Sequence, residues 1–287
     1  MKHLILTRFN LRIWKEDKHG KPTLTDVWLH ERVALFEHYC LPSMIAQTCQ
    51  DFRWIILFDY ESPEWLLKKV DEWVAACPQI RPVSVKPANQ GIFRRVFREV
   101  AISEAEEQGG RMLTTYLDND DALRYDFVAD VQQLAAKMPS GRFISYHYGL
   151  QYFTEMKIAT LVHCKYNHFP SYVEDYEKPD AIETFFKLVS HAQMKTLPRD
   201  EILHIENPEK PMWMEVVHPT NKYNDVHVGL RTRLVTDKTS VQETFGTKEM
   251  TYARNPKSVF STQFLPRFVR QFFHRVSEKI FGIKLKN

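Results

Sequence analysis

The pattern of apolar and polar positions predicts alternating strands and helices through the first 123 residues. Apolar runs of strand length occur at 3–7, 53–58, 80–85 and 112–117. The run ending at Phe58 is almost continuously apolar, which is typical of a strand buried on both faces of a parallel sheet. Between these runs, apolar residues recur every three or four positions, as on one face of a helix. This order predicts an α/β fold with a Rossmann-like, mostly parallel sheet and helices on both faces.

The sequence also predicts where these helices begin and end. The first covers 26–40, with Asp26 as its N-cap, and is interrupted by Pro42 because proline removes a helical hydrogen bond. The second begins after Ser62, the expected N-cap, with Pro63 at its first position. The third carries its apolar residues on one face, namely Ile92, Phe93, Val96, Phe97 and Val100.

The pattern changes after residue 140. Shorter apolar runs at 142–148, 150–155 and 158–162 predict antiparallel strands, and a polar loop follows at 166–179. A helix is expected at 180–191 and a further strand at 211–217. The second half therefore predicts a mixed arrangement that completes the sheet.

Polar segments follow three of the predicted strands directly. They are Arg8-Phe9-Asn10 after the first, Asp59 after the second and Asp118-Asn119-Asp120-Asp121 after the fourth. Open parallel sheets bind ligands beyond the carboxyl ends of their strands. The sequence therefore predicts a binding site at this edge.

The carboxylates of this last segment point to a metal ion. Asp118, Asp120 and Asp121 lie within four residues, and such a cluster is unfavourable unless a cation occupies it. Oxygen ligands suit Mg²⁺ or Mn²⁺, which complete their shells with water and phosphate oxygens. The alternative is an acidic turn that caps a helix starting near Arg124.

Composition and charge exclude few classes of protein. The 287 residues are 44% hydrophobic, enough for one large domain, and the net charge of +3 is too small to indicate a nucleic-acid partner. The four cysteines form no C-x-x-C pair and the N-terminus lacks an apolar signal segment, so a cytoplasmic location is expected. Motifs of P-loop NTPases, dinucleotide dehydrogenases, serine hydrolases and zincins are absent from the sequence.

The segment 114–123 resembles the D-x-D segment of GT-A glycosyltransferases. More narrowly, the chain resembles a bacterial family of rhamnosyl transferases over roughly residues 3–221, in stretches at 6–10, 35–43, 47–59, 118–121 and 213–221. The tripeptides Arg8-Phe9-Asn10 and Leu41-Pro42-Ser43 are more specific to this family than the D-x-D motif alone.

This resemblance implies a GT-A catalytic domain at 1–260, with a nucleotide-sugar half at 1–123 and an acceptor half at 124–260. The donor would be a dTDP-, UDP- or GDP-sugar with Mg²⁺ or Mn²⁺ on its diphosphate, and the acceptor a glycan or lipid-linked molecule. By analogy Asp118 would contact the ribose, Asp120 would bind the metal, and Asp121 and His218 would assist. The other donor-binding residues would be Arg8, Phe9, Asn10, Asp59, Arg94 and Arg95.

An inverting transfer needs a carboxylate that takes the acceptor's proton. Glu174 and Asp175 in the polar loop are the expected catalytic residues, and Glu215 and Asp225 are next in line. Two other functions stay open, a metal-dependent nucleotidyltransferase and a non-catalytic glycan-binding protein.

His163, Cys164 and His168 resemble one half of a zinc site. A second paired half is missing from the sequence, so zinc is not expected there.

Residues 261–287 predict a basic amphipathic helix. Its apolar stripe is Leu265, Phe268, Phe272, Val276, Ile280 and Ile283, with Arg267, Arg270 and His274 opposite. Such a helix suits the surface of an anionic membrane, which would make the enzyme a peripheral protein. The same stripe could instead pack against the catalytic domain, because periodicity does not say what covers a face.

Overall fold

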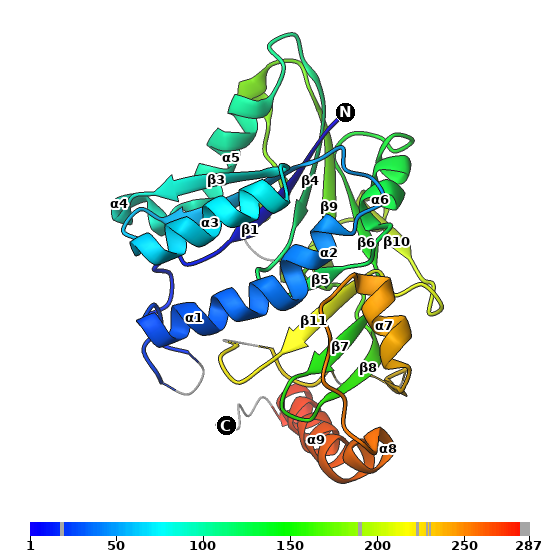
Figure 1. The fold of residues 1–287 in the computed structure, drawn as a ribbon. Coiled ribbons are helices and arrows are strands. Elements are labelled where there is room, and N and C mark those ends of the chain that lie inside the picture. Colours follow the sequence, from blue (N-terminus) through cyan, green and yellow to red (C-terminus); the bar gives the residue numbers. More distant parts are fainter. Residues whose placement is uncertain (18–19, 189–190, 222–223, 228, 230, 282–287) are drawn as a thin grey trace.

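The computed structural model describes residues 1–17, 20–188, 191–221, 224–227, 229 and 231–281 and contains two β-sheets (Figure 1). The larger sheet has seven strands in the order β10-β6-β9-β4-β1-β2-β3. Their bounds are β1 Lys2–Arg8, β2 Arg53–Asp59, β3 Ile80–Val85, β4 Gly110–Tyr116, β6 Arg142–Tyr146, β9 Ser171–Tyr176 and β10 Ile202–Ile205. Strands β3, β2, β1 and β4 are parallel neighbours, and β9 is antiparallel to β4 and β6. The mostly parallel α/β fold expected from the sequence is confirmed.

Helices cover both faces of this sheet. One face packs its Trp54 and Ile56 against α1 (Asp26–Leu35), α3 (Glu64–Ala76) and α6 (Phe127–Ala135). The other face packs its Ile55 and Leu57 against α5 (Phe93–Glu104) and against Ile182, Phe185, Leu188 and Met194. A short helix, α4 (Pro87–Gln90), precedes α5. The expected apolar face of α5 is confirmed for Phe93, Phe97 and Val100, which are buried, but not for Ile92, which is exposed at the N-cap.

The first helical segment is longer than expected, since α1 continues through a π-helical turn at Phe36–Cys40 into α2 (Leu41–Ile45). Pro42 therefore does not interrupt it. Proline leaves the carbonyl of His38 without its helical donor, and the backbone N–H of Lys248 donates to that carbonyl at 3.0 Å.

Two predicted N-caps are wrong by one residue. Thr25, not Asp26, caps α1 by accepting from the backbone N–H of Trp28. Pro63, not Ser62, is the N-cap residue of α3, because the Ser62 hydroxyl donates to the carbonyl of Asp59 instead.

Two predictions in the second half are also wrong. The expected polar loop at 166–179 contains β9, whose tyrosines and valine pair with the core strand β4. The expected helix at 180–191 is a series of 3₁₀ turns at Pro179–Ala181, Phe185–Lys187 and His191–Thr196. Thr184 has a φ of 66°, which ends any helix there.

The smaller sheet has five strands in the order β12-β8-β7-β11-β5. They are β5 Ala122–Leu123, β7 Tyr148–Phe153, β8 Ile158–His163, β11 Trp213–Val217 and β12 Arg233–Val235. The antiparallel pairing of β7 with β8 confirms the prediction for 150–155 and 158–162, whereas β6 lies in the larger sheet and β7 and β11 are parallel. Helix α7 (Lys238–Phe245) packs Val241 and Phe245 on this sheet. Figure 1 shows α1 running between the two sheets.

The C-terminal helix α9 (Leu265–Phe281) continues from α8 (Pro256–Val259) through a π-helical turn, so the predicted boundary at 260/261 lies inside one helical run. Phe264 and Phe268 pack against the end of the smaller sheet. Arg267 forms an ion pair with Asp225 at 2.6 Å. The expected stripe is thus divided, because Phe268 is docked while Leu265 and Phe272 are exposed. Ile283 lies outside the described residues.

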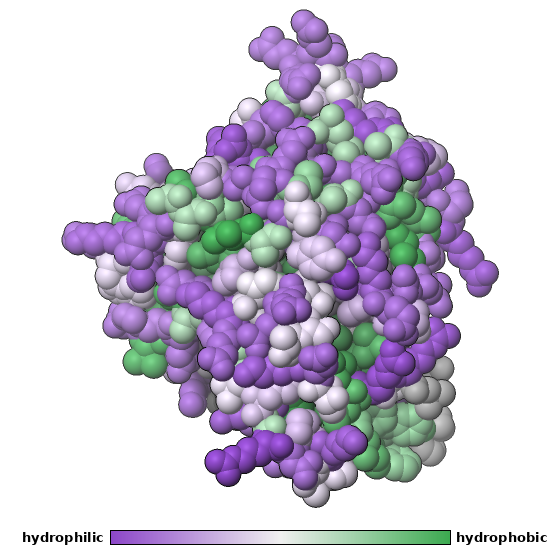
Figure 2. Space-filling view, turned by 45° about the vertical axis from the view of Figure 1, so that its right-hand side comes forward, coloured by the Kyte–Doolittle hydropathy of each residue, from purple (hydrophilic) through white to green (hydrophobic). Residues whose placement is uncertain are grey.

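The surface in Figure 2 is largely hydrophilic, with apolar patches separated by polar side chains. Within the described part of the chain, every helix is too short or too polar to cross a membrane.

Candidate functional site

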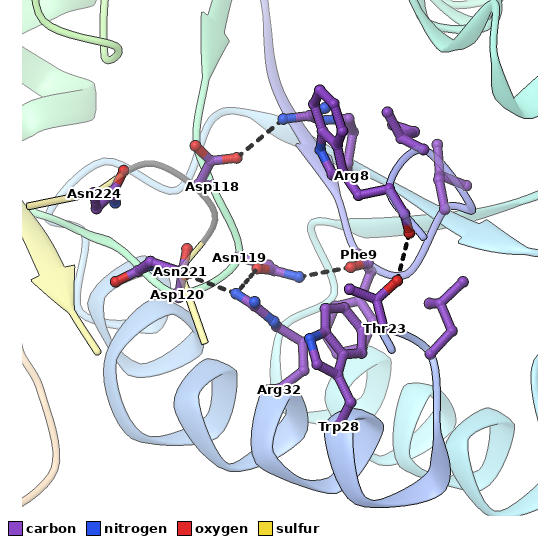
Figure 3. A pocket seen from close by; sticks show the side chains of 14 residues that line it. Arg8, Phe9, Thr23, Trp28, Arg32, Asp118, Asn119, Asp120, Asn221 and Asn224 are labelled. Atoms are coloured by element: carbon purple, nitrogen blue, oxygen red, sulfur yellow. Dashed lines mark hydrogen bonds and ion pairs between the residues drawn. The ribbon is translucent and has the colours of Figure 1, made fainter. Parts of the chain in front are cut away.

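The acidic segment lies where the sequence predicts it, beyond the carboxyl end of β4. Because β1 and β4 are parallel neighbours, Arg8 at the end of β1 reaches the same edge. Figure 3 shows Asp118, Asn119 and Asp120 on this loop, with Arg32 and Trp28 extending toward them from α1. Parallel strands and α1 thus bring residues 8, 32 and 118–121 together.

Asp120 is the centre of a buried network. Its Oδ2 accepts from Arg32 Nη1 at 2.7 Å, His218 Nε2 at 2.8 Å and Asn221 Nδ2 at 3.1 Å. Burial alone would raise the pKa of Asp120, but Arg32 and His218 outweigh it and hold the pKa below its usual value. Asp120 is therefore a carboxylate whose charge is already balanced by Arg32.

Asp121 is fully buried and faces a different histidine. Its Oδ1 accepts from the backbone N–H of Val216 at 2.8 Å, and its Oδ2 lies 3.0 Å from His168 Nε2. Burial and the charge of Asp120 raise the pKa of Asp121. Burial alone would lower the pKa of His168, but Asp121 and Glu215 raise it to about 9. This pair therefore holds a shared proton or, in its place, another cation.

Asp118 is the more open carboxylate, with a side chain 32% exposed. Its Oδ1 accepts from the Tyr116 hydroxyl and lies 3.5 Å from Arg8 Nη2. Arg8 Nε also donates to Tyr116 at 2.8 Å. Arg8 and Tyr116 fix Asp118 at the mouth of the site.

A cavity of about 200 Å³ lies against these groups. Its walls include Arg8, Trp28, Arg32, Asp118 and Asp120 (Figure 3). A larger cavity of about 710 Å³ lies between α1 and the loop after β11, and Trp28 also lines it.

Of the two arginines predicted on α5, Arg94 lies at the site and Arg95 does not. The guanidinium carbons of Arg8 and Arg94 both lie 4.8 Å from the centre of the Phe93 ring. Burial and the neighbouring Arg8 lower the pKa of Arg94. Arg95 instead pairs with Glu99 at 2.8 Å on the exposed face of the helix.

Three side chains predicted to bind the donor make contacts that stabilise the fold. The Phe9 ring packs in the core, and only its carbonyl reaches the site, where it accepts from Asn119. Asn10 Oδ1 accepts from the backbone N–H of Asp59 at 3.0 Å. The Asp59 carboxylate accepts from Gln90 at 2.8 Å and from Arg12 at 2.6 Å. These bonds hold the ends of β1 and β2 in place.

The predicted catalytic pair, Glu174 and Asp175, lies away from this edge. Because β9 is antiparallel to β4, Asp175 is opposite Arg111 near the start of β4 and forms an ion pair with it at 2.6 Å. That is roughly 20 Å along the strand from Asp118. Glu174 is buried and accepts from the backbone N–H groups of Glu183 and Thr184.

Glu215, the next candidate, lies on β11 beside the site. Its Oε2 accepts from Gln151 Nε2 at 2.7 Å and lies 3.0 Å from His227 Nε2. Burial alone would raise the pKa of Glu215, but His227 and His168 outweigh it and lower the pKa. Glu215 is thus ionised. Asp225 is instead paired with Arg267 of α9.

The group of side chains that could hold a metal ion differs from the predicted Asp120, Asp121 and His218. Donor atoms of Asp118, Asp121 and His168 all lie within 4.8 Å of one another. Asp120 is instead engaged with both Arg32 and His218. Sequence reasoning missed Arg32, His168 and Asn221, because only the fold brings them to the acidic segment. Of these, His168 stands out in the sequence only as part of the zinc-like pattern of His163, Cys164 and His168, where zinc is not expected.

A mostly parallel sheet with clustered acids and two arginines at its carboxyl edge is the arrangement of a GT-A-type glycosyltransferase. Residues 6–229 match the model of the family described as "Putative rhamnosyl transferase". The chain belongs to this family.

The chain also has distant matches among solved structures. One is the S. aureus protein TarS 1–349, with a TM-score of 0.40 and 10% identity; the alignment covers 75% of this chain and 60% of TarS 1–349. Another is a putative nucleotide-diphospho-sugar transferase from Desulfovibrio desulfuricans G20, with a TM-score of 0.36, 10% identity and coverage of 77% and 84%. No curated protein matches the sequence significantly.

Proposed function

We propose that the protein transfers a sugar, with rhamnose the first candidate, from a nucleotide-diphosphate donor to a glycan or lipid-linked acceptor. The observation that carries this proposal is the convergence of Asp118, Asp121 and His168 next to two arginines. Arg8 and Arg94 supply the positive charge and planar donors that suit a diphosphate. Asp118, the most open of these acids, is suited to bind the ribose or the metal.

Mg²⁺ or Mn²⁺ is the proposed cofactor, held by Asp118, Asp121 and His168. Two carboxylates and one imidazole form a mixed oxygen and nitrogen donor set, which favours Mn²⁺ over Mg²⁺. The fit is supported by Asp121, a fully buried acid whose nearest charged partner is His168. When bound, such a cation neutralises the leaving diphosphate.

Glu215 is the proposed proton acceptor for an inverting transfer. It is ionised at neutral pH and lies near His168, whose charge contributes to its low pKa. Gln151 and His227 hold its Oε2 in a fixed position. A fixed carboxylate beside the metal-binding set is suited to take a proton from an acceptor hydroxyl.

The exposed side of α9 is proposed to lie against an anionic membrane that carries the acceptor. Leu265, Val269, Phe272 and Phe273 are 39–64% exposed, and Arg270 and Arg275 are exposed beside them. Contacts also connect α9 to Glu215. Arg267 pairs with Asp225, whose carbonyl accepts from Gln151, and Gln151 also donates to Glu215.

Product analysis tests the central proposal. The full-length protein is incubated with Mn²⁺ and a panel of dTDP-, UDP- and GDP-sugars that includes rhamnose donors. Release of nucleoside diphosphate is expected. Release of pyrophosphate instead would show a nucleotidyltransferase and overturn the proposal.

Mn²⁺ binding tests the metal set without relying on activity. Electron paramagnetic resonance of free Mn²⁺ is recorded with donor present, for the wild type and for Asp118→Asn and His168→Asn. Both variants should lose donor-dependent binding. A matched control is Asp175→Asn, since Asp175 lies at the opposite end of β4, and it should bind normally.

The variant Glu215→Gln tests whether Glu215 is the proton acceptor. It should retain its affinity for the donor, and the rate of its chemical step should fall by about 10²–10⁴-fold. Normal turnover of Glu215→Gln would exclude Glu215 as the base.

Co-sedimentation with phosphatidylglycerol vesicles at low salt tests the membrane proposal. The wild type should sediment, and a Phe272→Ser/Phe273→Ser variant should not. Leu67→Ser, which changes a similarly exposed residue on α3, is the control and should sediment. Equal sedimentation of all three proteins would exclude α9 as the binding surface.

A further inference from the structure

A second group of metal-binding side chains lies at the junction of the two sheets. His147 links β6 to β7, His163 ends β8 and Glu206 follows β10. Donor atoms of all three lie within 4.8 Å of one another. None of them belongs to the glycosyltransferase site described above.

The spacing of these atoms matches a tetrahedral ion. Glu206 Oε1 lies 3.1 Å from His147 Nδ1 and 3.8 Å from His163 Nε2. Zn²⁺ bonds of about 2.0–2.1 Å in tetrahedral geometry separate neighbouring ligand atoms by roughly 3.3 Å. The side chains therefore need only small shifts to surround an ion.

One of the three side chains directs an unsatisfied nitrogen into this group. The Nε2 atom of His163 is buried and has no hydrogen-bond partner among the described residues. A buried imidazole nitrogen without a partner is unfavourable, and a metal ion would satisfy it.

The orientation of His147 is fixed as in known metal sites. Its Nε2 lies 2.8 Å from His204 Nδ1, so the nitrogen that faces Glu206 is Nδ1. Metal-binding histidines generally donate their other ring N–H to a second group. His204 is therefore a positioning residue.

Glu206 offers a ligand atom and lies where an ion can enter the site from solvent. Its side chain is 52% exposed, so an ion can reach the site from solvent. Arg231 Nη1 lies 3.3 Å from the other carboxylate oxygen, Oε2, and leaves Oε1 directed at the histidines.

We propose that His147, His163 and Glu206 bind a Zn²⁺ ion that joins the strand ends of the two sheets. Two imidazoles and one carboxylate favour zinc over the hard ions Mg²⁺ and Ca²⁺. Water completes the shell. Since β6 and β10 belong to the larger sheet and β8 to the smaller one, the ion stabilises their junction.

Isothermal titration of the full-length protein with Zn²⁺ tests the proposal. The wild type should bind Zn²⁺, and His163→Gln and Glu206→Gln should each weaken this binding by at least about tenfold. Glu206 is half exposed, so its variant should fold even if the histidine variant does not. Zn²⁺ should also raise the melting temperature of the wild type, but not that of Glu206→Gln.

Two controls separate this site from other histidines. His30→Gln changes an exposed histidine on α1, and His168→Asn changes the glycosyltransferase site; both should retain this Zn²⁺ binding. The proposal is overturned if the wild type does not bind Zn²⁺. It is also overturned if binding is lost in His168→Asn or His30→Gln but kept in His163→Gln and Glu206→Gln.

Discussion

The ion pair of Asp120 with Arg32 makes Asp120 a structural residue whatever its role in catalysis. Arg32 has a side chain only 10% exposed, and its Nη1 contacts Asp120 and Asn119. Removing one partner of a buried ion pair leaves the other charge without compensation. The position of Asp120 in the sequence suggests a metal ligand, whereas its surroundings make it the counter-ion of an arginine.

Asp120→Ala is therefore expected to lower the free energy of unfolding by about 3–5 kcal/mol. Urea denaturation measures this change. Asp200→Ala, which removes an exposed ion pair with Arg142, is the control and should change stability by less than about 0.5 kcal/mol. A small effect of Asp120→Ala would show that Arg32 finds another partner.

His3 gives the protein a pH-dependent stability. It is buried, its Nδ1 lies 3.3 Å from Gln132 Nε2, and its Nε2 lies 3.0 Å from Thr115 Oγ1. The Gln132 amide donates to Nδ1, so a proton on that nitrogen would face another donor. Burial lowers the pKa of His3 to about 3.

Because the folded pKa of His3 is below the unfolded value of 6.5, its contribution is complete above pH 6.5 and is lost as the pH falls toward 3. The loss is at most about 1.4 kcal/mol per pH unit. Denaturation at several pH values should give a flatter profile for His3→Gln than for the wild type. Parallel profiles would contradict the prediction.

At the scale of elements, β7 and β11 can pair only because Gly149 has no side chain. A Cβ at Gly149 would lie 2.1 Å from Cδ2 of Trp213. Trp213 is itself fixed, since it is fully buried, stacks on Phe169 and donates to the carbonyl of Tyr146. The close approach of the two strands supports the loop that carries His218.

Gly149→Ala is expected to destabilise the protein by about 3 kcal/mol or more, because the indole cannot move away without breaking these contacts. Gly91→Ala is the matched control, since no atom lies within 4 Å of its added Cβ. Thermal unfolding should show a lower melting temperature for Gly149→Ala only.

At the scale of the whole molecule, α9 both closes the fold and presents an apolar face to solvent. Phe264 is fully buried against the end of the smaller sheet, whereas Phe273 is 64% exposed. The side of this helix that packs on the domain is therefore different from the side proposed to lie on a membrane.

Phe264→Ala is expected to cost about 3–5 kcal/mol of stability, and Phe273→Ala less than about 0.5 kcal/mol. Deletion of 262–287 should likewise destabilise the protein, because it uncovers Phe153 and Ile158. Chemical denaturation distinguishes the variants. An unchanged stability after deletion would show that the docked side contributes nothing.

Much of the fold could be predicted from the sequence because it depends on local patterns. The four strands of the first half are apolar runs, and the acidic segment follows the fourth directly. Since parallel strands present their carboxyl ends at one edge, the meeting of Arg8 with Asp118 also followed from strand order.

Only the tertiary structure decided what each polar side chain does there. Arg32, His168 and Glu215 come from a helix, a loop and a strand of the other sheet, and no spacing along the chain links them to residues 118–121. The local structure at Glu174 and Asp175 is predicted wrongly from the sequence, because an antiparallel strand and a polar loop can share the same composition. Sequence determines which faces are apolar and where strands end, since these are local properties. Which charges meet, and therefore which acid pairs with an arginine and which remains available to a metal, depends on contacts between distant segments.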